Sequence, residues 1–317
     1  MLASHEVLRF LNMGASSPAS ANTLAAIQDS HQECDLLIKG GTVIDPGQQL
    51  HATLDVAVKD GKILGIFRDY PESRARRVVS GKGKIVTPGL IDLHVHVFEG
   101  VGIGGVNPDL CCLAKGVTTV VDGGSAGYSM IAGFRKYVAN TSSTRVFALV
   151  DLGALGLVVP TKDSMNNLEW VNPQLTAKAA RENKPTVVGI KVRLEKKIQG
   201  QHDVECLKRA LEAAEASHLP LMAHIDNPYS PLPILLKMMR KGDVYTHYCN
   251  DHPNGMLDAT GKILPEVLEA RARGVLFDVG HGSLHFSFDV AEKCLQQNFL
   301  PDTISSDIAI SSVYGPV

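Results

Sequence analysis

The stretch PGLIDLHVH, residues 88–96, separates two parts of the chain with different patterns. Its second half begins a strand-like apolar run in which His94 and His96 lie two positions apart. Alternate strand residues share a face, so the two imidazoles can bind one metal ion. Chance gives roughly 0.45 His-x-His matches in such a chain, and requiring Asp92 as well lowers this to roughly 0.03. The alternative is a pair of core histidines.

Beyond this stretch, apolar runs alternate with helical patterns such as residues 204–217 and 265–273. Continuous apolar strands between helices indicate a parallel sheet that is buried on both faces. Eight such units predict an α/β fold, a closed (β/α)8 TIM barrel over residues 89–317. The eight strand-like runs are residues 91–97, 118–122, 146–151, 187–192, 219–225, 244–248, 275–279 and 303–308.

Before the stretch, residues 34–88 contain short β-rich runs. Asp60-Gly61 between two of these runs predicts a hairpin. We therefore expect a small antiparallel β module, the N-terminal part of a β-sandwich, since three short runs make a poor sandwich alone. The chain also ends ten residues after Asp307, where a barrel would need a last helix. We expect a truncated C-terminus that lacks this helix; the alternative is an abrupt barrel end.

Composition excludes several classes of protein. The 317 residues are 44% hydrophobic, and the net charge of −2 does not favour nucleic acid or an anionic membrane. Six scattered cysteines are typical of a reducing cytoplasm. No apolar run reaches the length of about 18 residues that a membrane span needs. Residues 1–33 are predicted to be a flexible N-terminal extension, with a transit peptide as the alternative. We expect a small-molecule substrate and leave a homo-oligomer open.

Later strand-like runs end in residues that can bind or bridge a metal. These residues are Lys191, His224, His247 and Asp307. The carboxyl ends of all strands in a parallel barrel meet at one face, where active sites are built. Each residue alone is more simply an ordinary hydrogen-bonded residue at a strand end. Together with His94 and His96, however, they predict one pocket.

These motifs resemble those of the amidohydrolase superfamily, in particular its binuclear members. The resemblance covers roughly residues 34–317, and PGLIDLHVH is its most specific part. LLIKGGTVIDP at 36–46 is similar to the usual start of the β module. GIKVR at 189–193 and SSD at 305–307 resemble the amidohydrolase/deacetylase group, which is related to dihydroorotase.

The resemblance implies two divalent metal ions and a CO2-derived carbamate on Lys191. An ammonium has no lone pair, whereas a carbamate offers two oxygens that can bridge ions about 3.5 Å apart. His94 and His96 are then expected to bind one ion with Asp307, while His224 and His247 bind the other. Zinc suits His-rich ligation, but manganese, iron and cobalt stay open. The alternative for Lys191 is an ion-paired or snorkelling lysine.

The implied reaction is hydrolysis of an amide or ester bond in a small molecule, as in a deacetylase, by a hydroxide that bridges the metals. Asp307 is the predicted catalytic proton acceptor. Arg193, His281 and Tyr248 are candidates for substrate binding, with Arg193 as a clamp for a carboxylate. For Arg193, an ion pair is an alternative of equal weight to substrate binding. For His281, a solvated loop position is an alternative of equal weight. His252 and His285 receive no role.

Three other functions stay open. A cyclic-amide hydrolase such as dihydroorotase or hydantoinase is one, although Phe98 stands where dihydroorotases usually carry Arg. A non-catalytic, truncated relative is another, although such proteins typically lose metal ligands and this chain keeps six. A mononuclear deaminase is the third, and it would not need Lys191.

Overall fold

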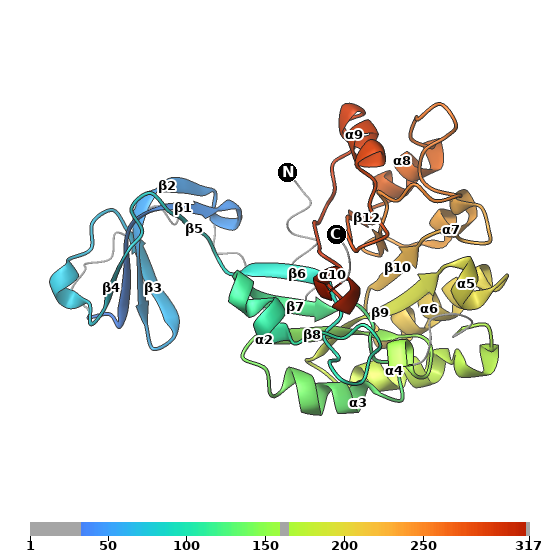
Figure 1. The fold of residues 1–317 in the computed structure, drawn as a ribbon, viewed down its shortest axis with the longest axis horizontal. Coiled ribbons are helices and arrows are strands. Elements are labelled where there is room, and N and C mark those ends of the chain that lie inside the picture. Colours follow the sequence, from blue (N-terminus) through green and yellow to red (C-terminus); the bar gives the residue numbers. More distant parts are fainter. Residues whose placement is uncertain (1–32, 159–164, 315–317) are drawn as a thin grey trace. The chain divides into compact units, whose positions relative to one another are not determined.

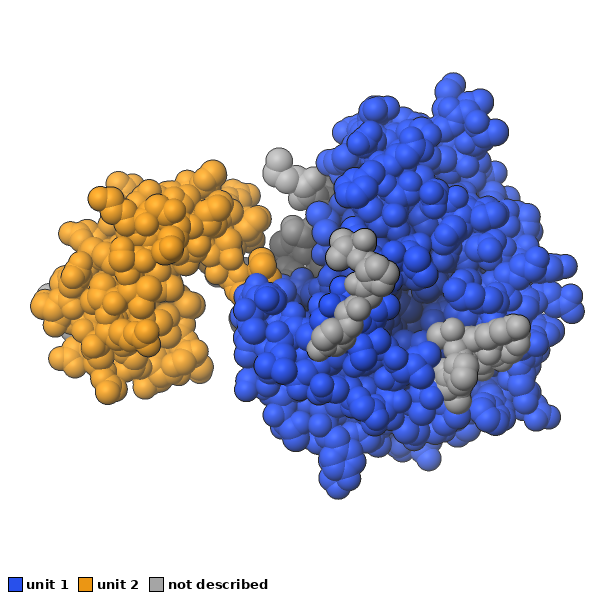
Figure 2. Space-filling model, viewed as in Figure 1, with its two compact units in different colours: residues 1–13, 91–317 blue, residues 14–90 orange. Residues whose placement is uncertain are grey.

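The computed structural model describes residues 33–158 and 165–314. These residues divide into two compact units, with the boundary between Leu90 and Ile91 (Figure 2). The sequence analysis placed this boundary two residues earlier. Nearly all of the predicted N-terminal extension lies outside the described residues. Among the described residues, no helix has the length and apolar character needed to cross a membrane.

In sequence order, the first unit ends at Leu90 (orange, unit 2 in Figure 2) and the second begins at Ile91 (blue, unit 1 in Figure 2). The first unit contains a single five-stranded sheet (Figure 1). The predicted hairpin is confirmed, because β2 and β3 pair antiparallel up to Lys59 and Lys62. The turn residues Asp60 and Gly61 have φ angles of 51° and 70°, which a two-residue turn between twisted strands requires. The strands are β1 Leu36–Asp45, β2 Leu50–Lys59, β3 Lys62–Phe67, β4 Val78–Ser80 and β5 Ile85–Val86, with 3-10 turns at η2 Pro46–Gln48 and η3 Glu72–Arg74.

The prediction that this unit is purely antiparallel is wrong. Its strand order is β3-β2-β1-β4, and both β4 and β5 pair with β1 in the parallel sense. Parallel neighbours need a crossover connection, and residues 68–77 between β3 and β4 make one. Local patterns reveal hairpins but not such crossovers, which explains the error.

The second unit is built on seven parallel strands that form a curled sheet in sequence order (Figure 1). Strands β9 and β10 are buried along their whole length, which confirms that the sheet is covered on both faces. The strands are β6 Leu90–Val95, β7 Val117–Asp122, β8 Arg145–Asp151, β9 Val187–Leu194, β10 Leu221–Ile225, β11 Val244–Thr246 and β12 Leu276–Asp278.

The eighth predicted strand is an extended segment with isolated bridges rather than a continuous ladder. Thr303 forms a parallel bridge to Asp278 in β12, and Ile308 forms one to Val95 in β6. The Asp307 N–H also donates to the His94 carbonyl at 2.8 Å. Residues 303–308 therefore join the two edge strands of the sheet.

Helices lie around the outside of the curled sheet (Figure 1). The predicted helices at 204–217 and 265–273 are confirmed as α6 and α8. Helix α4 begins where Asn172 accepts from the Leu175 N–H and Pro173 supplies a fixed φ. The helices are α2 Pro108–Cys111, α3 Ile131–Phe134, α4 Pro173–Glu182, α5 Lys196–Gln199, α6 Asp203–Ser217, α7 Leu232–Met238, α8 Pro265–Ala272, α9 Phe288–Gln296 and α10 Ile310–Tyr314; the short turns are η4 Leu113–Lys115, η6 Gly156–Val158 and η7 Leu168–Trp170, and η5 Arg135–Ala139 is a π-helix.

A separate apolar cluster holds the seven strands together. It takes one buried residue from each strand, so it ties the sheet into one rigid element. Its members are Leu93, Val121, Leu149, Val188, Met222, Val244 and Leu276. The Sδ atom of Met222 also lies 3.6 Å from the Lys191 Nζ, which places the polar residues described next directly against this cluster.

Candidate active site

The two histidines of the HxH motif meet Asp307 at the end of β6. The Oδ1 atom of Asp307 lies 3.1 Å from the Nε2 of His96 and 3.4 Å from the Nε2 of His94. The backbone bond between Asp307 and His94 holds the two chain segments together. The structure thus brings together the three residues predicted for the first metal ion.

A buried hydrogen-bond chain fixes the tautomer of His94. The Thr246 hydroxyl donates its hydrogen to Asp278 at 2.8 Å. It must therefore accept from the Nδ1–H of His94, 3.1 Å away. Burial lowers the pKa of His94 well below its usual 6.5, so the ring is neutral and its Nε2 carries a lone pair. Such outer hydrogen bonds are typical of metal-binding histidines.

Lys191 reaches this lone pair from β9. Its Nζ donates to the His94 Nε2 at 2.9 Å, and the side chain is buried. Burial lowers its pKa to about 8. The loop after β7 makes room for both residues, since a Cβ on Gly123 would lie 2.2 Å from the His94 Cδ2 and one on Gly124 would lie 2.7 Å from the Lys191 Cγ. The two glycines therefore allow His94 and Lys191 to approach the backbone of this loop closely.

His224 in β10 and His247 just after β11 form the other side of the cluster. Their ring centroids are 4.3 Å apart. His247 donates its Nδ1–H to the Gly280 carbonyl at 2.6 Å, which leaves a lone pair on Nε2. Burial lowers the pKa of His247 to about 3 and that of His224 well below 6.5. Both imidazoles are therefore neutral.

The Nε2 atoms of His224 and His247 are buried and, among the described residues, have no hydrogen-bond partner. An unsatisfied buried nitrogen destabilises the fold by about 1–3 kcal/mol. A metal ion would pair with the Nε2 lone pair of His247, and with that of His224 in the tautomer protonated on Nδ1, since neutral imidazole is a common ligand. This side of the cluster, together with His94 and Asp307, therefore fits metal ions by its chemistry.

Asp307 is ionised despite its burial. Burial on its own would raise the pKa of this carboxyl group, but the hydrogen bond from His96 helps to hold it well below the usual 3.8. Its backbone has a φ of 49°, a left-handed conformation that Asp tolerates better than most residues. The carboxylate can therefore bind a cation or accept a proton.

His285 also lies against this cluster, although the sequence pattern assigned it no role. This residue lies in the loop between β12 and α9, with its ring centroid 4.3 Å from His247 and 5.0 Å from His224. Its Nδ1–H donates to Asp226 at 2.8 Å. A loop residue shows no strand periodicity, so the pattern that found the other histidines could not find this one.

Arg193 lies beside the cluster, because this residue of β9 pairs with His224 in the neighbouring strand β10. Its Nε is 3.3 Å from the Asp151 Oδ2. No guanidinium nitrogen has a well-aligned hydrogen bond within the described part of the chain, although all are buried. Both readings from the sequence, an ion pair and an anion clamp, are compatible with this geometry.

Two other predicted residues stay outside the cluster. Tyr248 is buried against Phe277 and Phe299, with ring centroids at 5.9 Å and 5.7 Å, so it belongs to the apolar core. His281 is exposed, and its ring stacks on Phe286. These contacts give no support to their predicted role in substrate binding. In the same region, Asn250 donates to the His247 carbonyl at 2.6 Å and supports the backbone.

Comparison with known proteins agrees with this geometry, although no protein-family model matches the chain. The chain is 36% identical over 286 residues to a deacetylase of Enterococcus faecalis. This match covers 89% of this chain and 75% of that protein. Dihydroorotases, such as that of Citrifermentans bemidjiense, match at 48% identity over only 63 residues, which is 20% of this chain and 15% of that protein.

Solved structures show the same relationship. A crystal structure of an adenine deaminase superimposes with a TM-score of 0.82 at 36% identity, over 90% of this chain and 76% of that one. A dihydroorotase superimposes with a TM-score of 0.79 at 28% identity, over 88% and 74% of the respective chains. The chain therefore belongs to the amidohydrolase superfamily of metal-dependent hydrolases.

Proposed function

We propose that the protein removes an acyl group, such as acetyl, from the amide or ester bond of a small molecule that carries a carboxylate. The observation that carries this proposal is the meeting of six residues from five strand segments in one cluster: His94, His96, Lys191, His224, His247 and Asp307. The similarity to the E. faecalis deacetylase supports the reaction type.

In this proposal the barrel is a (β/α)8 barrel and the cluster holds two divalent ions, zinc being the first choice. His94, His96 and Asp307 would bind one ion, and His224 and His247 the other. Lys191, converted to a carbamate by CO2, would contribute an anionic oxygen to each. When bound, the ions supply Lewis-acid activation of water and of the scissile carbonyl.

Asp307 would move the proton. Its ionised carboxylate lies against His94 and His96, so it can accept a proton from the attacking water and pass it to the leaving nitrogen or oxygen. Such proton transfer typically contributes a factor of about 10²–10⁴ in rate. Replacement by Asn keeps the shape but removes this basicity.

Arg193 supports the choice of a carboxylated substrate. A buried guanidinium without aligned hydrogen bonds is costly, and a carboxylate could satisfy two of its N–H groups at once. The position that binds carboxylate in dihydroorotases is different here, because Phe98 is buried and its ring packs 5.3 Å from that of Phe134.

The test is a substrate panel for the full chain reconstituted with zinc and bicarbonate. It should include N-acyl amino acids, O-acyl hydroxy acids, cyclic imides and adenine, the last because of the structural similarity to an adenine deaminase. We expect turnover of acylated carboxylic acids, with Asp307→Asn slower by about 10²-fold or more. Turnover of only adenine or cyclic imides would contradict the proposal, and so would folded protein that binds no metal.

A further inference from the structure

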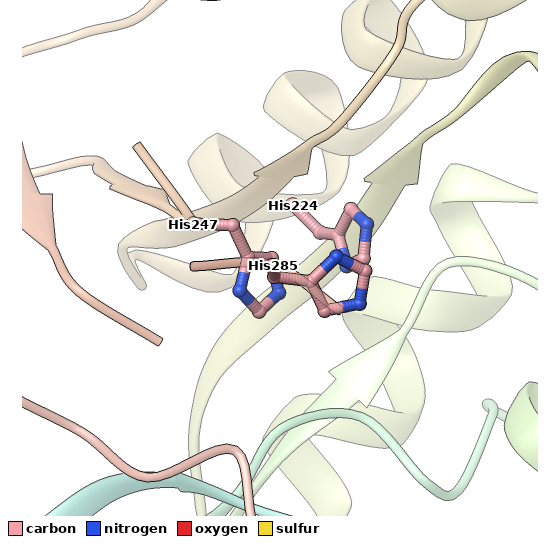
Figure 3. Close-up of side chains that lie close together, drawn as sticks. All are labelled: His224, His247 and His285. Atoms are coloured by element: carbon pink, nitrogen blue, oxygen red, sulfur yellow. The ribbon is translucent and has the colours of Figure 1, made fainter. Parts of the chain in front are cut away.

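Three imidazoles, not two, gather on the β10–β11 side of the cluster (Figure 3). One nitrogen each of His224, His247 and His285 lies within 4.8 Å of the other two. The His285 ring faces the His247 ring at a centroid distance of 4.3 Å and an angle of 35°. His285 reaches this place from a loop, whereas the other two come from strand ends.

The hydrogen bonds of these rings decide which nitrogen is available. His247 donates its Nδ1–H to Gly280, and His285 donates its Nδ1–H to Asp226. Each ring therefore keeps its lone pair on Nε2. The Nε2 atoms of His224 and His247 have no hydrogen-bond partner among the described residues. A cation bound between the three rings would therefore pair with nitrogens that are otherwise unsatisfied.

Asp226 holds His285 firmly. It follows His224 by two residues and its side chain is 2% exposed. One oxygen accepts from the His285 Nδ1 at 2.8 Å, and the other accepts from the His252 Nδ1 at 2.5 Å. A carboxylate that orients an imidazole through Nδ1 is the usual support of a metal-binding histidine.

We propose that His285 is a third imidazole ligand of the ion that His224 and His247 bind, and that Asp226 orients it; this inference rests on the proposed function. Zinc binds an imidazole nitrogen at about 2.0–2.1 Å, so nitrogens that all lie within 4.8 Å of one another are near the spacing that one shared ion requires. Three imidazoles are also a common ligand set of catalytic zinc.

The test measures metal binding in variants of the full chain. His285→Asn removes the imidazole, which stands on a loop. Asp226→Asn keeps the imidazole of His285 but weakens the hydrogen bond that orients it. Leu284→Ala is the matched control, because Leu284 is the exposed neighbour of His285. We expect His285→Asn to keep one tight ion and to bind the second at least about 10–100-fold more weakly, the range seen when even a supporting residue is lost. Asp226→Asn should show a smaller loss and Leu284→Ala none.

Two further readouts separate the explanations. The visible spectrum of the cobalt-substituted protein reports the ligand set directly, and it should change in His285→Asn but not in Leu284→Ala. Equal melting temperatures of the metal-free forms would show that the variant folds. Two ions bound with wild-type affinity and an unchanged cobalt spectrum in His285→Asn would overturn the inference, even if KM rises. If the folded wild-type chain binds no ion, the proposed function itself fails.

Discussion

The Nζ atom of Lys191 lies 2.9 Å from the Nε2 of His94, although the two residues come from different strands and are both buried. Burial lowers the Lys191 pKa to about 8. At pH 7 such a pKa leaves about a tenth of the side chains neutral, against about one in three thousand for an ordinary lysine. Only the neutral amine reacts with CO2, so the lowered pKa of Lys191 supports the proposal that this lysine is carbamylated.

The first prediction concerns this lysine. Metal-free protein supplied with 13C-bicarbonate and zinc should give a carbamate signal by 13C NMR, and Lys191→Met should not. Because the neutral fraction grows as the pH rises toward about 8, carbamate should form faster at pH 8 than at pH 6. Lys191→Met should also bind less metal. An identical signal in the variant would place the carbamate on another group.

The second prediction tests the close approach of the loop after β7. Gly123→Ala would put a methyl group 2.2 Å from the Cδ2 of His94. We expect destabilisation by about 1–3 kcal/mol, as for other overpacked sites, and weaker metal binding because His94 must shift. Gly133→Ala is the control, since its Cβ would meet no atom within 4 Å and alanine favours a helix by about 0.5–1 kcal/mol. Thermal unfolding and metal titration of both variants measure the difference.

The residues that local pattern could predict are those whose position follows from strand periodicity. His94 and His96 share a strand face, Lys191 lies in the middle of the fully buried strand β9, and His224 lies near the end of the fully buried strand β10. The eighth strand-like run, residues 303–308, could be predicted because it too follows a strand pattern. It forms only isolated bridges, however, because Asp307 adopts a positive φ that interrupts a regular ladder.

The positions of Tyr248 and His285 depend on the backbone path, which the sequence pattern does not give. His247 has a φ of 70°, so the alternation of faces ends there and Tyr248 turns into the core instead of the cluster. His285 depends on the path of a loop, and sequence alone did not distinguish it from His281 four residues earlier. Tertiary contacts, chiefly the bond to Asp226, select His285.

The third prediction concerns the stability of the first unit. Asp55 is buried and accepts hydrogen bonds from the Gly40 and Tyr70 N–H groups and from the Lys39 ammonium. Burial alone would raise the pKa of this carboxyl group, but these bonds hold it below 3.8. Asp55→Asn should lower the free energy of unfolding by about 1–3 kcal/mol at neutral pH.

The sign of the pH dependence follows from this lowered pKa. The ionised form is favoured by folding, so its contribution is present above pH 3.8 and is lost as the pH falls through the lower folded-state value. The difference between the wild type and Asp55→Asn should therefore shrink in acid. Denaturant unfolding at several pH values checks this, and a difference that grows in acid would contradict the assignment.

The last prediction separates the two readings of Arg193. If its guanidinium binds the substrate carboxylate, Arg193→Met should lower kcat/KM for carboxylated acyl substrates by about 10–100-fold, as expected for hydrogen bonds to a charged group of about 1.5–3 kcal/mol. Neutral acyl substrates should be affected much less. Arg193→Lys keeps the charge but loses the planar fork, so it should recover only part of the loss, mainly in KM. If Arg193 instead serves only the ion pair with Asp151, both substrate classes lose activity equally and the melting temperature falls. Parallel kinetics on one carboxylated substrate and its methyl ester, together with thermal unfolding of each variant, distinguish the two outcomes.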